Sequence, residues 1–246
     1  NAAGGEKTMF EEEMEKAAAL YGFPLHTEQM KKLGVYYSLL IEWNTKMNLT
    51  AITEPREFAV KHIIDSLTAF RGIEDVNAFH LIDIGTGAGF PGIPLKIVRP
   101  DIKLVLLDSL KKRVRFLETV VEVLGLEDTA CLHGRAEEAA RENSLRESFD
   151  VAVSRAVARL PVLAEYLLPF VRIGGRALAL KGLHSEEEAQ EARHAVKLLG
   201  GAAIKTIPVL LPGLSDKRAV LVMEKERFTP KNYPRKAGTP AKEPLL

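Results

Sequence analysis

The feature that most constrains the fold is an alternation of short apolar runs with amphipathic stretches between residues 80 and 199. The apolar runs cover residues 80–84, 103–108, 129–134, 149–154 and 175–180. Stretches with helical spacing separate them, at 93–98, 110–124, 136–143, 158–171 and 186–199. Because the apolar runs are nearly continuous, this order predicts an α/β domain with a parallel sheet covered by helices on both faces.

The alternation stops after residue 199. Two further apolar runs, 203–212 and 218–225, are separated by "GLSD" with no helical stretch between them. Such a short connection predicts a hairpin, so the last strand should run antiparallel to its neighbours. We therefore predict a mostly parallel seven-stranded sheet with an antiparallel last strand over residues 80–225.

Two segments flank this domain. Helical spacing at 8–21, 27–44 and about 54–70, with no strand pattern, predicts an N-terminal helical extension over residues 1–79. Residues 226–246 are rich in proline and basic side chains and predict an extended tail.

Composition excludes some classes of protein. The net charge of +1 does not by itself indicate a nucleic-acid partner, although bases outnumber acids after residue 79. No apolar run approaches the roughly 20 residues of a membrane span, and there is no signal-peptide pattern. With Cys131 as the single cysteine, we expect a cytoplasmic protein that binds no membrane. His62 and Asp65 share a helix face without a third ligand, so we interpret them as capping or packing groups and predict no metal site.

A glycine-rich turn, "GTGAGFPG", follows the first predicted strand and is the strongest indication of a ligand. Ligands of open parallel sheets bind beyond the carboxyl ends of the strands, and Gly85 and Gly87 let backbone approach them closely. A dinucleotide formula should begin at Gly85, but its third glycine would then be Phe90. Asp83 at the strand tip would repel a diphosphate. It suits S-adenosylmethionine, which carries a sulfonium and an ammonium group and no phosphate.

The ends of the next strands supply further candidates. Asp108 ends the second strand and is placed to accept hydrogen bonds from a ribose diol, or alternatively to cap the helix that follows. Ala136 and Glu137 follow the third strand and are expected at the adenine edge, although Glu137 also suits a helix first turn. Arg155 follows the fourth strand, near the methyl-donor end. The alternative there is a surface arginine paired with a carboxylate.

The motifs "DIGTGAGFPGIPL", "DSLKKRVRFL", "GRAE", "SRAVA" and "TPKNYPRKAGTPAKEPL" resemble the RsmG (GidB) family of bacterial 16S rRNA methyltransferases, as do "EWN", "NLTAI" and "KHIIDSLT". The resemblance implies a class I S-adenosylmethionine-dependent methyltransferase fold, which is Rossmann-like. It implies methyl transfer to N7 of a single guanine (position 527) of 16S rRNA in the small ribosomal subunit, with no DNA partner. It also implies S-adenosylmethionine contacts at Gly85, Phe90, Ala136, Glu137 and Arg155. A guanidinium stays protonated, so we expect Arg155 to position a ligand and not to act as a base.

Basic residues at three places are candidates for RNA contacts. Lys111, Lys112 and Arg113 lie in the first turn of a helix, where cations oppose the helix dipole, so a nearby phosphate would explain them. The alternative is a solvated face paired with neighbouring acids. Further candidates are Lys181 at the end of the fifth strand, and Lys231, Arg235 and Lys236 on the tail. The alternative for the tail is that it wraps back onto the domain.

Two other functions stay open at this point. The first is a nicotinamide-dependent oxidoreductase, because Gly87, Gly89 and Gly92 match the dinucleotide spacing in a shifted frame. The second is a non-catalytic ribosome-assembly factor that binds RNA on a methyltransferase fold.

Overall fold

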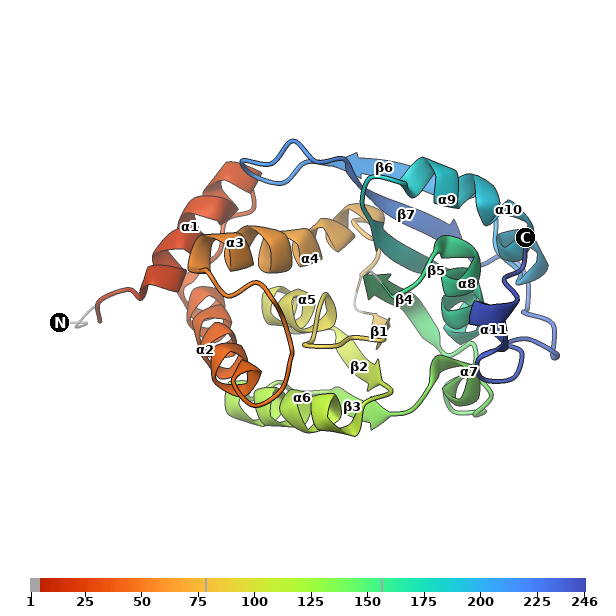
Figure 1. Cartoon of the computed structure of the whole chain (residues 1–246), viewed down its shortest axis with the longest axis horizontal. Coiled ribbons are helices and arrows are strands. Elements are labelled where there is room, and N and C mark those ends of the chain that lie inside the picture. The colour runs from red at the N-terminus through yellow and green to blue at the C-terminus, as the bar shows by residue number, and fades with distance from the viewer. Residues whose placement is uncertain (1–4, 78, 156) are drawn as a thin grey trace.

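A computed structural model describes residues 5–77, 79–155 and 157–246, and its centre is one seven-stranded sheet (Figure 1). The strands are β1 (His80–Ile84), β2 (Lys103–Asp108), β3 (Thr129–His133), β4 (Phe149–Arg155), β5 (Val171–Lys181), β6 (Lys205–Val209) and β7 (Arg218–Glu224). Their order is β3-β2-β1-β4-β5-β7-β6. Neighbours from β3 to β5 pair in parallel, and β7 runs antiparallel to both β5 and β6. The predicted sheet, including its antiparallel last strand, is confirmed.

Helices cover both faces of this sheet, as the continuous apolar strands predict (Figure 1). One face carries α5 (Gly92–Val98), α6 (Lys111–Leu124) and the N-terminal helices. The other carries α7 (Ala136–Ala139), α8 (Leu160–Leu167), α9 (Ser185–Glu191) and α10 (Arg193–Leu198). Along β1 the side chains alternate between these cores, Leu81 on the first and Ile82 on the second.

Several helices are shorter than the sequence predicts. The stretch 136–143 is helical only to Ala139, and 186–199 divides into α9 and α10 at Ala192. The stretch 158–171 becomes α8 followed by a single 3-10 turn over Leu168–Phe170. Short amphipathic patterns do not show where a helix stops, because the stop depends on contacts with distant residues.

The N-terminal extension contains α1 (Met9–Tyr21) and α2 (Thr27–Asn44), then a third helical segment. That segment joins α3 (Pro55–Phe58), a π-helical stretch over Ala59–Ile64, α4 (Asp65–Leu67) and a 3-10 stretch over Thr68–Gly72. One continuous cluster of buried side chains includes these helices and the inner face of the sheet. The extension therefore shares its core with the α/β domain, and Tyr36 of α2 donates a hydrogen bond to the Ala88 carbonyl in the glycine turn (2.5 Å).

The tail wraps back onto the domain and ends beside α8, with one short helix, α11 (Thr239–Lys242) (Figure 1). Arg146 donates hydrogen bonds to the carbonyls of Thr229 (3.1 Å) and Tyr233 (2.8 Å). Arg235 pairs with Glu165 of α8 (2.8 Å). The wrapped tail weighed as an alternative from sequence is thus the arrangement found. None of the described helices combines the length and apolarity needed to cross a bilayer.

Candidate functional site

The glycine turn begins where β1 ends and lies at the carboxyl edge of the sheet. Gly85 and Gly87 have φ of +63° and +61°, a conformation that side chains rarely adopt. A side chain at Gly85 would also meet Val157 at 2.8 Å, whereas none of the described atoms lies within 4 Å of the position a Cβ would take at Gly87. The turn therefore presents bare backbone to the space above Gly87, as predicted.

Asp83 lies beneath this turn and is fully buried. Its Oδ2 accepts hydrogen bonds from the Thr86 hydroxyl (2.7 Å) and the Gly92 amide (2.8 Å). Its Oδ1 has no hydrogen-bond partner among the described residues, and burial raises the pKa of the carboxyl to about 8. With this pKa the ligand-free carboxyl is mostly protonated at neutral pH, because burying its charge is costly. A cationic ligand seated on the turn would favour the ionised carboxylate, whereas a diphosphate would oppose its ionisation.

A cavity of about 510 Å³ opens beside the turn, at the ends of β1, β2 and β3. We call it the β2–β3 cavity. It is lined by Ile84, Gly85, Leu107, Asp108, Ser109, Gly134, Arg135, Ala136, Glu137, Val157 and Tyr166. This one cavity is therefore lined by four of the predicted residues, Gly85, Asp108, Ala136 and Glu137, although they come from separate segments of the chain.

Asp108 and Glu137 each make contacts with backbone amides. The carboxylate of Asp108 accepts from the Gly87 amide (2.8 Å) and from the amide of Leu110 (2.9 Å), the residue before α6, so it holds the glycine turn and the segment that leads into α6. One oxygen of Glu137, Oε2, accepts from the Gly238 amide of the tail (2.8 Å) and from Arg135 (3.2 Å). A carboxylate oxygen can accept more than one hydrogen bond, so both side chains retain acceptor capacity toward the cavity.

Arg155 lies at the end of β4 and joins a network of charged side chains. It donates to the Lys61 carbonyl (3.1 Å) and Asp65 Oδ2 (3.1 Å), and its second Nη faces His62 Nδ1 (2.9 Å). Asp65 is buried and accepts from Arg218 of β7 through its other oxygen (2.6 Å). The alternative predicted for Arg155, a surface arginine paired with a carboxylate, is therefore correct for the pairing with Asp65 but wrong for the location, because the pair is largely buried.

The network defines the state of His62. Its Nδ1 faces a guanidinium, which only donates, so the ring proton lies on Nε2 and points to the Thr50 hydroxyl (2.7 Å). Burial and the charge of Arg155 lower the pKa of His62 to about 3. His62 is therefore neutral at physiological pH and already has a partner at each ring nitrogen.

These charged side chains line a second cavity of about 510 Å³, which we call the β4–β5 cavity. Its wall includes Lys61, His62, Asp65, Arg155 and Arg218. The sequence interpretation of His62 and Asp65 as packing groups missed that they hold Arg155. The signal was present in "NLTAI" and "KHIIDSLT", which supply Thr50, His62 and Asp65.

The ring of Phe90 points away from the β2–β3 cavity. It stacks on His62 with ring centroids 4.4 Å apart, and the Arg155 guanidinium lies 5.0 Å from its centre. Phe90 thus belongs to the core of the helical extension, and only its backbone is left to contact a ligand on the turn.

The predicted RNA residues fall into two groups. Lys111, Lys112, Lys231 and Lys236 are exposed, and Arg113 is half-buried with a guanidinium nitrogen 3.8 Å from Asp108. Lys181 is only 8% exposed, and its ammonium bonds the Ala158 carbonyl and pairs with Glu188 (3.1 Å). The guanidinium of Arg235 likewise donates a hydrogen bond to Glu165. In this arrangement neither Lys181 nor Arg235 presents a free cation to RNA, because each is paired with an acid of the same chain. Their positions in the sequence, at a strand end and on the tail, do not indicate these partners.

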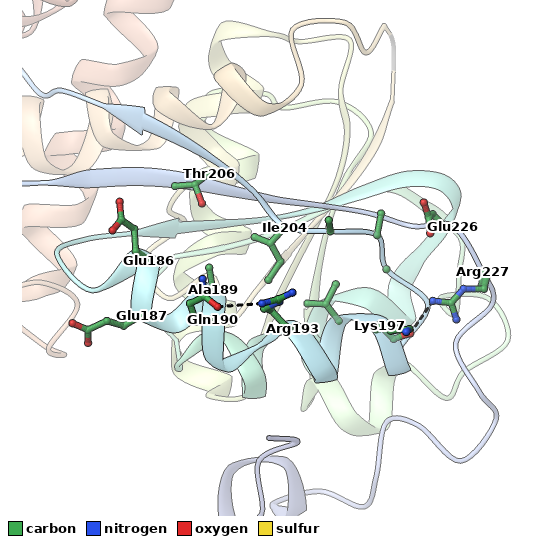
Figure 2. Close-up of a pocket in the computed structure, with 14 residues that line it drawn as sticks. Glu186, Glu187, Ala189, Gln190, Arg193, Lys197, Ile204, Thr206, Glu226 and Arg227 are labelled. Atoms are coloured by element: carbon green, nitrogen blue, oxygen red, sulfur yellow. Dashed lines mark hydrogen bonds between the residues drawn. The ribbon is translucent and has the colours of Figure 1, made fainter.

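A larger cavity, of about 900 Å³, lies away from this edge, between α9, α10 and the outer strand β6 (Figure 2). Figure 2 shows its cations turned to neighbours within the chain, Arg193 toward Gln190 (3.5 Å) and Arg227 toward the Lys197 carbonyl (2.9 Å). No residue of the glycine turn lines it. We therefore place the functional site at the β2–β3 and β4–β5 cavities.

Comparison with known proteins gives one consistent result. The family model described as "rRNA small subunit methyltransferase G" matches residues 29–212. A protein named ribosomal RNA small subunit methyltransferase G from Alkaliphilus metalliredigens is 50% identical over 224 residues, covering 91% of this chain and 94% of the relative. A protein of the same name from Desulforamulus reducens is 47% identical over 232 residues, covering 94% and 97%.

Solved structures of methyltransferases have the same fold. Precorrin-6y C5,15-methyltransferase from Geobacter metallireducens has a TM-score of 0.50 at 10% identity, over 73% of this chain and 92% of that one. M. jannaschii TYW2 in complex with AdoMet has a TM-score of 0.50 at 13% identity, over 67% and 75%. Likeness at this identity shows the fold alone, and the fold is that of class I S-adenosylmethionine-dependent methyltransferases.

Proposed function

Because this chain belongs to the rRNA small subunit methyltransferase G family, we propose that it transfers a methyl group from S-adenosylmethionine to N7 of one guanine of 16S rRNA. The observation that carries the choice of cofactor is Asp83, a buried carboxylate with an unpaired oxygen beneath a turn of bare backbone. That arrangement supports a cationic ligand over the diphosphate that a nicotinamide-dependent oxidoreductase would need.

The β2–β3 cavity is the place we propose for the cofactor. Gly85 lines the cavity, the nearby Gly87 supplies open backbone above Asp83, Asp108 faces the ribose, and Ala136 and Glu137 face the adenine. When bound, the cofactor supplies an electrophilic methyl group on a sulfonium. The chain's own residues orient that group and exclude water around it, which is the main contribution a protein can make to a displacement between two held reactants.

The β4–β5 cavity is the place we propose for the target guanine. Guanine N7 has a free lone pair, so its methylation needs no general base. This agrees with the network, in which His62 is neutral with both nitrogens engaged and Asp65 is paired with two arginines. Arg155 acts as a positioning cation, held by Asp65 and stacked on Phe90.

Exposed lysines extend this site toward the RNA backbone. We assign Lys111, Lys112, Lys231 and Lys236 to phosphate contacts and leave Lys181 and Arg235 as internal supports, with Arg113 at the margin of the cofactor cavity. The partner is the small ribosomal subunit or its rRNA, so the protein acts in the cytoplasm, and we expect neither DNA nor a membrane as a partner.

The test is methyl transfer to small subunits from a strain that lacks this protein. The purified chain, isotopically labelled S-adenosylmethionine and those subunits should give one methylated guanine, identified as 7-methylguanine by mass spectrometry of RNA fragments. An Arg155→Ala variant should bind the cofactor but transfer methyl groups slowly. Absence of transfer by the wild-type chain with the cofactor bound would favour the non-catalytic assembly factor, and methylation at another atom would overturn the N7 assignment.

A further inference from the structure

The C-terminal tail contacts the wall of the β2–β3 cavity at Glu137, although the two segments are far apart in the sequence. The Gly238 amide donates to Glu137 Oε2 (2.8 Å), a contact between residues 101 positions apart. We propose that residues 226–246 position Glu137 so that its other oxygen, Oε1, accepts a hydrogen bond from the exocyclic amine of adenine. This inference rests on the proposed function, because it deepens the account of how the same cavity recognises S-adenosylmethionine.

The tail is held tightly enough to act in this way. Its first half is fixed by Arg146, which donates to the carbonyls of Thr229 and Tyr233, and by Glu147, which accepts from the Thr229 amide (3.0 Å). Its second half is fixed by Glu165 of α8, a buried carboxylate that accepts from both the backbone and the side chain of Arg235 (2.7 and 2.8 Å). Charge-assisted contacts of this kind restrain the backbone on both sides of the segment that leads to Gly238.

Glu137 is arranged to use that restraint. The residue is 3% exposed and lines the cavity, and its Oε2 is the oxygen that accepts from Gly238 and from Arg135. None of the described residues donates a hydrogen bond to Oε1, which is not among the buried unpaired atoms. Without Gly238, the remaining partner among the described residues is the Arg135 guanidinium, whose side chain is 51% exposed and so is little restrained by packing. Of the two hydrogen bonds that orient the Glu137 carboxylate, the one from the tail thus comes from the more restrained donor.

The chemistry of such a carboxylate is selective. Adenine presents an amine, a hydrogen-bond donor, at the position where hypoxanthine presents a carbonyl oxygen, an acceptor. A positioned carboxylate attracts the first group and repels the second, and a hydrogen bond to a charged group changes affinity by about 10-fold to 100-fold when it is lost. A loosely held carboxylate would lose both the affinity and the selectivity.

The experiment measures binding of S-adenosylhomocysteine and its inosine counterpart, S-inosylhomocysteine, by calorimetry. The wild-type chain is compared with a chain that ends at Ala237, which removes the Gly238 amide and keeps Arg235. A chain that ends at Glu243 is the control for truncation, because it keeps Gly238 and α11. A second pair is Gly238→Pro and Gly22→Pro. Proline has no backbone N–H and cannot adopt the positive φ of either glycine (+89° and +78°), so each change removes one N–H donor and strains the backbone, but only the first donor contacts Glu137.

We expect the wild type, the chain ending at Glu243 and Gly22→Pro to prefer the adenine ligand at least about tenfold. The chain ending at Ala237 and Gly238→Pro should bind it about tenfold more weakly and discriminate less than about twofold. Melting curves verify folding, and if the shorter chain does not fold, Gly238→Pro alone decides. Unchanged selectivity in the folded variants, or no selectivity in a wild type that binds, overturns the tail's role and leaves the proposed function intact. A wild type that binds neither ligand contradicts the proposed function itself.

Discussion

The β2–β3 and β4–β5 cavities lie at the same edge of the sheet but differ in the chemical groups that line them. The first is walled mainly by strand ends and turns, and its carboxylates are engaged by backbone amides, as Asp108 is by Gly87 and Leu110. The second is walled by charged side chains from distant segments, with Asp65 shared between Arg155 and Arg218. Backbone groups present a fixed surface to a small ligand, whereas a side-chain network depends on every member being present.

This difference can be tested most strongly at Asp65. Asp65→Ala leaves two largely buried guanidinium groups without their shared carboxylate, which should lower the free energy of unfolding by about 3–5 kcal/mol. Denaturant unfolding measures this directly. The matched control is Asp75→Ala, which removes an exposed carboxylate from Arg176 and should have a small effect. Equal losses in the two variants would contradict a network that depends on Asp65.

Beneath the glycine turn, beside the other cavity, the corresponding change is Asp83→Asn. It keeps the shape of the side chain and removes the carboxyl group, which a bound cation would hold in its ionised form, so S-adenosylmethionine should bind about 10-fold to 100-fold more weakly. Affinity for S-adenosylhomocysteine, whose sulfur is uncharged, should fall less. Calorimetry with both ligands tests the claim, and an equal loss for the two would show that Asp83 does not act through the sulfonium charge.

Asp83 should also make the ligand-free protein sensitive to pH. Its pKa is raised from 3.8 to about 8 by burial, so the folded state holds a proton that the unfolded state loses above pH 3.8. The contribution of Asp83 to the free energy of unfolding is therefore fully present below pH 3.8. It declines as the pH rises toward 8, by at most about 1.4 kcal/mol per pH unit. Denaturant unfolding at pH 5, 6, 7 and 8 should show this slope as the difference between wild type and Asp83→Asn. A flat difference would refute the raised pKa.

The smallest expected effects lie outside both cavities, at the exposed lysines. Lys111→Ala and Lys112→Ala should each reduce the salt dependence of RNA binding by roughly 0.7–0.9 in the slope of log affinity against log salt. Removing these cations from the first turn of α6 should not lower stability, because they oppose the helix dipole. Lys16→Ala on α1 is the control and should leave the slope unchanged. Filter-binding or fluorescence titrations at several salt concentrations measure it.

The sequence was sufficient for the parts of the molecule that are built from local patterns. The strands β1, β2 and β4 lie within one residue of their predicted bounds, and the ends of β1, β2 and β3 do meet around the glycine turn. Apolar runs and glycine turns carry this information because a buried parallel strand needs apolar side chains on both faces.

The pairing of charged side chains could not be predicted in the same way. Asp65 and Arg218 are 153 positions apart, and Arg235 and Glu165 are 70 apart. Position and charge predict that Lys181 and Arg235 face RNA, but in the structure each forms an ion pair with a buried acid. Which acid a base meets is a property of the folded chain, so these residues needed the structure.

We infer that S-adenosylmethionine occupies the β2–β3 cavity and that the target guanine occupies the β4–β5 cavity, whose wall includes Arg155. A crystal structure of the chain with S-adenosylhomocysteine and a guanosine nucleotide would locate both ligands. We predict the adenosine between Asp108 and Ala136, the sulfur above the glycine turn, and the guanine beside Arg155. Adenosine density in the groove beside α9 and α10, or a guanine bound away from Arg155, would contradict the account.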